Sequence, residues 1–168
     1  MANTYVAIAT VTVGSGGAAN IEFTSIPATY TDLVIKGSFR RETGGAEQLL
    51  ISFNNNTSNY SHRVLETNGT SVTSNTGTSR VAGLINAATY TANTFANNEI
   101  YIPNYAGSTN KSYSSDSVME NNATANYLYL VAGLWSDTSA ITSIKLTDAG
   151  AADFDQYSTA TLYGIKNS

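Results

Sequence analysis

Apolar and polar residues alternate along several short segments of this chain, and the spacing typical of amphipathic helices is nearly absent. In residues 33–40, Leu33, Ile35 and Phe39 fall on one face of an extended strand, with charged and hydroxyl side chains on the other. Residues 49–53 repeat this pattern. The alternation restricts the chain to β-structure in which one face of each strand is buried.

Residues 127–135 (YLYLVAGLW) differ because apolar side chains occupy both faces of the expected strand. Val131 and Trp135 fall on one face, and Leu130 and Leu134 fall on the other. The segment therefore predicts a central strand that is covered on both sides. Truncation of Leu130 or Val131 to alanine is then expected to cost about 2–4 kcal/mol of folding free energy.

Turn-forming steps separate the apolar segments at short intervals. They lie at residues 14–17, 44–45, 54–56, 68–69 and 149–150. Many short strands joined by turns predict one all-β domain over residues 1–168, a single-domain antiparallel β-sandwich of jelly-roll type with roughly ten strands. Residues 67–79 and 87–98 are weakly patterned, so we expect long loops or irregular edge strands there; residues 84–96 could also hold a short helix.

Only 12% of the residues are charged, which is about half the usual share of roughly 25%. The net charge is −4, and the densest basic position, Arg40-Arg41, is followed at once by Glu42. Nucleic-acid binding needs a basic stripe that neutralises phosphates, so we do not expect it. The chain has 0 cysteines, which excludes disulfides and thiolate metal sites, and no apolar run is long enough to suggest a membrane partner.

No arrangement of residues predicts catalysis, a cofactor or a metal. The single histidine, His62, follows Ser61 in an extended segment, so the two side chains point to opposite faces and cannot pair as base and nucleophile. We expect a surface or loop histidine. Asp148, Asp153 and Asp155 do not have the spacing of a calcium-binding EF-hand loop, so we expect a solvated acidic turn between the last two strands.

Charged and aromatic positions are the candidates for contact with a partner. They are Arg40, Arg41, Tyr60, His62, Arg63, Tyr105, Lys111 and Tyr113. The arginines belong to mixed-charge clusters that either contact another subunit or are solvated strand ends. The tyrosines, together with Tyr90, Tyr101 and Trp135, offer ring faces to a glycan, or else they pack in the core.

The closing segment, residues 140–166 (AITSIKLTDAGAADFDQYSTATLYGIK), resembles the C-terminal hairpin of structural proteins in tailed bacteriophages, many of them marine. Further landmarks of that family occur upstream and in the same order. They are residues 23–27 with 31–35, residues 53–54 with 59–61, and residues 102–105 leading to Lys111. Together these landmarks span most of the chain.

The resemblance implies a structural protein on the surface of a virion, made in the cytoplasm of the host cell. A short domain without a heptad or collagen-like stalk favours a capsid decoration, or cement, protein that binds the outer surface of the head and stabilises it. The expected partners are the major capsid protein or other virion proteins, together with further copies of the chain, for example in a trimer. The alternative is a tail-fibre or receptor-binding module that recognises host surface glycans.

Overall fold

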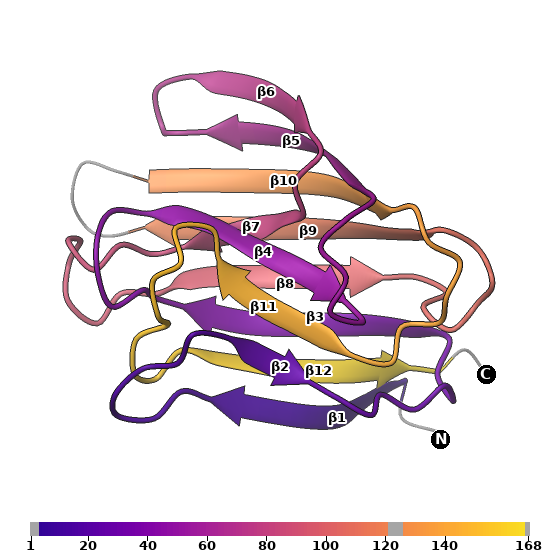
Figure 1. Ribbon diagram of the computed structural model, residues 1–168. Coiled ribbons are helices and arrows are strands. Elements are labelled where there is room, and N and C mark those ends of the chain that lie inside the picture. Colours follow the sequence, from indigo (N-terminus) through magenta and orange to yellow (C-terminus); the bar gives the residue numbers. More distant parts are fainter. Residues whose placement is uncertain (1–3, 121–125, 167–168) are drawn as a thin grey trace.

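Two antiparallel β-sheets pack face to face in the computed structural model, which describes residues 4–120 and 126–166 (Figure 1). Within these ranges the strands are β1 (Tyr5–Thr12), β2 (Ile21–Phe23), β3 (Asp32–Phe39), β4 (Glu47–Phe53), β5 (Tyr60–Thr67), β6 (Val72–Gly77), β7 (Val81–Ile85), β8 (Ala96–Ile102), β9 (Lys111–Glu120), β10 (Asn126–Trp135), β11 (Ile144–Asp148) and β12 (Thr159–Ile165). No helix capable of spanning a membrane is found in them.

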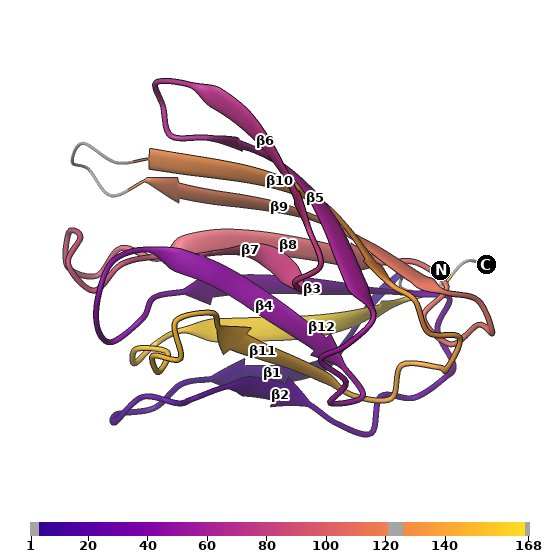
Figure 2. The ribbon, with the colours of Figure 1, turned by 45° about the horizontal axis from the view of Figure 1, so that its top comes forward.

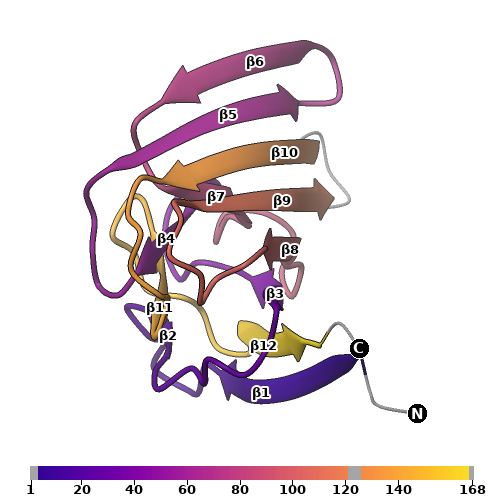
Figure 3. The ribbon, with the colours of Figure 1, turned by 90° about the vertical axis from the view of Figure 1, so that its right-hand side faces the viewer.

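The larger sheet has eight strands in the order β1-β12-β3-β8-β9-β10-β5-β6, and the smaller has four in the order β2-β11-β4-β7. Viewed from the side in Figure 3, the eight strands follow one arc, and β2, β11 and β4 lie against its inner side. The β5–β6 end diverges from β4 and β7, as Figure 2 shows. The predicted antiparallel sandwich is thus confirmed, whereas its jelly-roll type stays a prediction.

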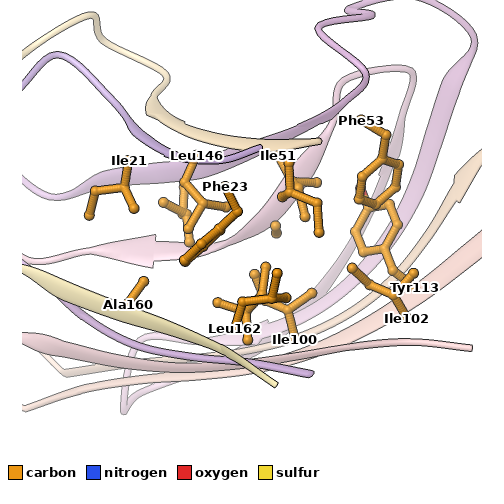
Figure 4. Packing of buried hydrophobic residues seen from close by; sticks show 14 of the residues in the cluster. Ile21, Phe23, Ile51, Phe53, Ile100, Ile102, Tyr113, Leu146, Ala160 and Leu162 are labelled. Atoms are coloured by element: carbon orange, nitrogen blue, oxygen red, sulfur yellow. The ribbon is translucent and has the colours of Figure 1, made fainter. Parts of the chain in front are cut away.

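The core fills the space between the two sheets, where alternate side chains of each sheet meet (Figure 4). Ile51 and Phe53 of the smaller sheet and Leu162 of the larger sheet are fully buried, each with 0% exposure. The ring of Phe53 packs edge-on against Tyr113, with 5.8 Å between ring centroids. A Cβ atom at Gly133 would lie 2.0 Å from the Tyr113 ring, so only glycine allows that ring to lie across β10.

Strand β7, at the edge of the smaller sheet, lies close to β8 and β9 of the larger sheet. Side chains of the larger sheet form hydrogen bonds with the backbone of β7 there, in place of a neighbouring strand. Asn98 donates through Nδ2 to the Leu84 carbonyl at 3.0 Å and accepts from the Leu84 N–H at 3.2 Å. Gly83 has a φ of 140°, and an added Cβ would lie 2.0 Å from Asn98 Oδ1. A glycine at this position therefore allows the close approach, and the side chains of β8 and β9 cover the edge of β7.

Most of the period-two predictions are confirmed. Leu33, Ile35 and Phe39 each have 0% exposure, and the asparagines after Phe53 form the expected turn, with φ of 52° at Asn54. The weakly patterned segments contain the exposed edge strand β6 and a loop at residues 87–95. The short helix considered at residues 84–96 is not formed, because β7 and β8 take up the ends of that segment.

The prediction for residues 127–135 is wrong in one respect. Strand β10 does lie inside the larger sheet, between β9 and β5, but only one of its faces is covered. Val131 is 1% exposed, whereas Leu128 and Leu130 on the opposite face are 47% and 58% exposed. The smaller sheet packs on the inner side alone. The expected cost of truncating Leu130 must therefore be lowered, while that for Val131 stands.

The last two strands do not form a hairpin. Strand β11 pairs with β2 and β4 in the smaller sheet, and β12 pairs with β1 and β3 in the larger one. The acidic residues 148–155 thus belong to a connection that crosses from one sheet to the other. The expected solvated turn is wrong for Asp148, which ends β11 and is 6% exposed, whereas Asp153 and Asp155 are half-buried.

Candidate functional site

Seven of the eight candidate contact residues are buried, with exposures of 8% or less. They are Arg40, Arg41, Tyr60, His62, Tyr105, Lys111 and Tyr113. Arg63 is exposed on β5. The structure therefore does not bring these residues together as a contact surface, and it gives the seven buried side chains roles inside the domain.

Arg40 anchors the loop between β7 and β8. Its Nη1 atom donates to the carbonyls of Thr91 at 3.1 Å and Thr94 at 3.0 Å, and Nη2 donates to the carbonyl of Ala88 at 2.9 Å. Nε also lies 3.4 Å from a carboxylate oxygen of Asp155. The sequence analysis expects either a contact with another subunit or a solvated strand end here, whereas the guanidinium group binds the loop between β7 and β8 of its own chain.

Arg41 forms a buried ion pair with Asp148 on the other side of the sandwich. Nε lies 3.0 Å from Oδ2, and Nη2 donates to Oδ1 at 3.1 Å. The two side chains are 9% and 0% exposed. Burial raises the pKa of Asp148 above its ordinary value, although the Ala152 N–H and Arg41 act in the opposite direction.

Lys111, His62 and Tyr113 likewise satisfy backbone carbonyls. The Lys111 ammonium donates to three carbonyls in neighbouring loops, and burial lowers its pKa. His62 Nδ1 lies 2.9 Å from the Ser79 carbonyl, which can only accept, so this nitrogen carries the proton. The expected surface or loop position of His62 is wrong: it is a strand residue with 6% exposure.

Most of the aromatic candidates for glycan contact are also buried. Tyr60 and Trp135 stack on each other in the core with 6.2 Å between ring centroids. Tyr105 donates a hydrogen bond to the Pro27 carbonyl from a fully buried position. Tyr101 is 37% exposed, and its hydroxyl donates to Asp32. Most of these rings therefore pack in the interior, which was the second of the two expectations.

Within the described ranges, no group of three or more His, Asp or Glu residues could hold a metal ion. Ser61 and His62 alternate across β5, and the histidine contacts Ser79 instead. The Ser61–His62 pair that the sequence analysis considered is therefore not formed.

An apolar surface on the outside of the larger sheet is the most unusual feature of the exterior. We call it the outer apolar face; it consists of Leu65, Val72, Val118, Leu128 and Leu130, which are 50%, 68%, 41%, 47% and 58% exposed. They come from four neighbouring strands, β9, β10, β5 and β6. Single exposed apolar residues are ordinary, but a contiguous group marks a surface that contacts something else.

The strand register explains why these side chains are contiguous. Leu130 lies directly opposite Leu65 of β5, and Leu128 lies directly opposite Val118 of β9. The four side chains project from the same side of the sheet, because their neighbours in sequence face the core. The exposed Arg63 and Asp116 border this group. The alternation of leucines in β10 indicates this surface in the sequence, but the same alternation also predicts a second buried face, which the structure does not form.

A second depression lies on the opposite, inner side of the same strands. We call it the tyrosine cleft; it is lined by Ala46, Glu47, Gln48, Leu84, Tyr90, Tyr127 and Tyr129. A neighbouring hollow shares Tyr127 and Tyr129 and extends to Glu66 and Thr73. The cleft forms where the β5–β6 end of the larger sheet diverges from β4 and β7 (Figure 2).

Comparison of the sequence with protein-family models and with curated proteins gives no match. The resemblance to structural proteins of tailed bacteriophages therefore depends on the sequence landmarks alone.

Proposed function

We propose that this protein is a structural component of a tailed-phage particle and decorates the outer surface of the head, to which it binds through the outer apolar face. The phage context comes from the sequence landmarks. The observation that carries the binding role is the group of five aliphatic side chains, each at least 41% exposed, on one side of one sheet. Water contact at so many neighbouring apolar side chains is unfavourable, so a partner surface that covers them stabilises the complex.

The surroundings of the outer apolar face fit a protein interface with an apolar centre and a polar rim. Arg63 and Asp116 border it, and neither forms an ion pair with another residue that the structure describes. Specific interfaces bury roughly 800 Å² on each partner, so five aliphatic side chains would form the centre and polar neighbours the rest. Such an interface depends mainly on apolar burial.

In the proposed mechanism, the protein stabilises the shell through the free energy of binding. Binding that occurs only to the assembled shell adds the free energy of association to the stability of that shell. Since few charges lie at the centre of the interface, we expect its affinity to change little with salt concentration. The partners we propose are the major capsid protein or other virion proteins, with further copies of the chain arranged around them.

The test uses particles of the phage that encodes this chain, stripped of the protein or grown without it. The purified protein should bind these particles to saturation and restore their resistance to heat and osmotic shock. Leu130→Asp places a charge at the centre of the outer apolar face and should abolish binding. Tyr157→Asn is the matched control, because Tyr157 is 67% exposed but lies in the connection between β11 and β12.

Equal binding of the Leu130→Asp variant would remove the outer apolar face from the proposal. Particles without the protein that are fully robust but fail to adsorb to host cells would contradict head decoration and support the receptor-binding alternative.

A further inference from the structure

We infer that the tyrosine cleft is a binding site for a neutral glycan, formed by three tyrosine side chains beside carboxylate and amide groups at the open end of the sandwich. This goes beyond the proposed adhesion to the phage head. None of the residues that the sequence analysis offered for partner contact belongs to this cleft, although Tyr90 was among the rings considered for sugars.

The position of the cleft follows from the unequal sizes of the sheets. The smaller sheet ends at β7, which packs against β8, β9 and β10, whereas the larger sheet continues to β5 and β6. Along β5 and β10 the inner side chains become less covered toward this end, because Val64 and Val131 are buried whereas Glu66 is half-buried. Tyr127 and Tyr129 are the inner residues of β10 at this point, and both remain half-buried.

The floor of the cleft is apolar and its walls carry the polar groups. Leu84, Ala96 and Met119 form a small separate core cluster, against which Tyr90, Tyr127 and Tyr129 pack. The rings therefore have one side supported by protein while part of each remains accessible. A supported ring face beside hydroxyl and carboxylate groups suits the mixed apolar and polar surface of a sugar ring.

Polar side chains surround the tyrosine hydroxyls. Glu66 of β5 and Gln48 of β4 lie beside Tyr129, so each sheet supplies a polar group next to its ring. Tyr90 and Tyr127 lie next to each other in the lining. Glu66 also accepts a hydrogen bond from Thr73 Oγ1 at 3.1 Å. Groups fixed in this way are ordered before a ligand arrives, which lowers the entropy cost of binding.

The charge of the lining selects the class of glycan. Glu47 lines the cleft and Glu66 the adjoining hollow, and among the described residues no lysine or arginine lines either. Burial raises the pKa of Tyr129, and the ordinary tyrosine pKa of about 10 already keeps its hydroxyl uncharged at neutral pH. Carboxylates repel sialylated, sulfated or uronic-acid sugars and accept hydrogen bonds from uncharged hydroxyls. The cleft therefore fits neutral hexoses and N-acetylhexosamines.

The cleft and the outer apolar face lie on opposite sides of the same strands. Residues 127 and 129 point inward along β10, and Leu128 and Leu130 point outward. A particle surface that covers the outer apolar face leaves the cleft accessible. Glycan binding can thus be tested separately from head decoration, because Leu130 does not line the cleft, and Tyr127 and Gln48 do not line the hollow at the outer apolar face.

The experiment measures binding of the isolated protein to a panel of neutral oligosaccharides built from glucose, galactose, mannose or N-acetylglucosamine, with sialylated and sulfated oligosaccharides as the anionic set. Calorimetry and saturation-transfer NMR provide the readouts. We expect saturable binding of at least one neutral oligosaccharide and none of the anionic set. Tyr127→Ala should weaken the affinity about tenfold or more, as truncation of a central aromatic contact does.

Three further variants keep the result interpretable. Tyr5→Ala removes an aromatic residue that is 49% exposed on β1, far along the sheet order from β10, and should bind the glycan normally. Gln48→Ala removes a polar group of the cleft lining and should weaken binding even if Tyr127→Ala fails to fold. The Leu130→Asp variant should retain glycan binding, which separates this inference from the proposed function.

Three results would overturn the inference: no neutral oligosaccharide of the panel binds, the anionic set binds better, or both cleft variants bind as well as the unaltered protein.

Discussion

The buried pair Arg41–Asp148 offers the sharpest test of how this domain is held together. Asp148→Ala would leave the Arg41 guanidinium, whose side chain is 9% exposed, without its carboxylate. Two contacts would be lost, at 3.0 Å from Nε and 3.1 Å from Nη2, and only the bond from Nη1 to the Gly45 carbonyl at 2.7 Å would remain. Removing one partner of a buried pair costs about 3–5 kcal/mol, because the other charge stays buried and unpaired.

The measurement is the free energy of unfolding from urea titrations of the purified protein, monitored by circular dichroism and by Trp135 fluorescence. Asp148→Ala and Arg41→Met should each lose about 3–5 kcal/mol, while the double variant Arg41→Met/Asp148→Leu should regain most of that loss because no charge remains buried. Lys36→Met is the control. It breaks an exposed pair with Glu99, where the side chains are 54% and 43% exposed, and should change stability by less than about 1 kcal/mol.

If Asp148→Ala changed stability as little as Lys36→Met, the pair would have to be solvated. The crossing connection between β11 and β12 would then not be anchored as the structure shows.

Three further outcomes are expected. Leu130→Ala should change the free energy of unfolding by only a few tenths of a kcal/mol, whereas Leu162→Ala, the same substitution at 0% exposure, should cost about 2–5 kcal/mol in urea titrations. Burial raises the pKa of Tyr60 to about 12. The free energy of unfolding should therefore fall as pH rises from about 10 to 12, because the Tyr60 hydroxyl loses its proton first in the unfolded state. Tyr60→Phe should reduce this dependence on pH. Asn54→Ala should lower the melting temperature more than Asn55→Ala, since both have positive φ but only the Asn54 side chain bonds residues 140–143.

Sequence was informative where burial alternates along one strand. Leu33, Ile35 and Phe39 could be assigned to the core because apolar residues at every second position share one face of a strand, although Val34 and Arg40 are buried as well. The same reasoning failed for Leu130, because a leucine that faces a second sheet and a leucine that faces a partner give the same pattern. The alternation indicates which apolar residues share one face of a strand. It does not indicate whether a second sheet or a partner covers that face.

Contacts between residues that are far apart in the chain could not be predicted from the sequence. Arg41 and Asp148 are 107 positions apart, and nothing in either local sequence indicates that they meet. The tyrosine cleft was missed for a similar reason. It depends on where β7 ends relative to β10, and Tyr127 and Tyr129 could equally have been covered by a further strand.

The place of β12 in the larger sheet determines when this sheet can be completed as the chain is synthesised. Strand β1 pairs with β12 alone, and β12 also fills the place between β1 and β3. Among the described strands β12 leaves the ribosome last, so β1 and one edge of β3 stay without this partner until all the other described strands have been synthesised. The nascent chain therefore cannot complete this sheet step by step from its first strand. We expect it to remain open to chaperones and proteases until residues 159–165 have emerged, and to close the sheet only then.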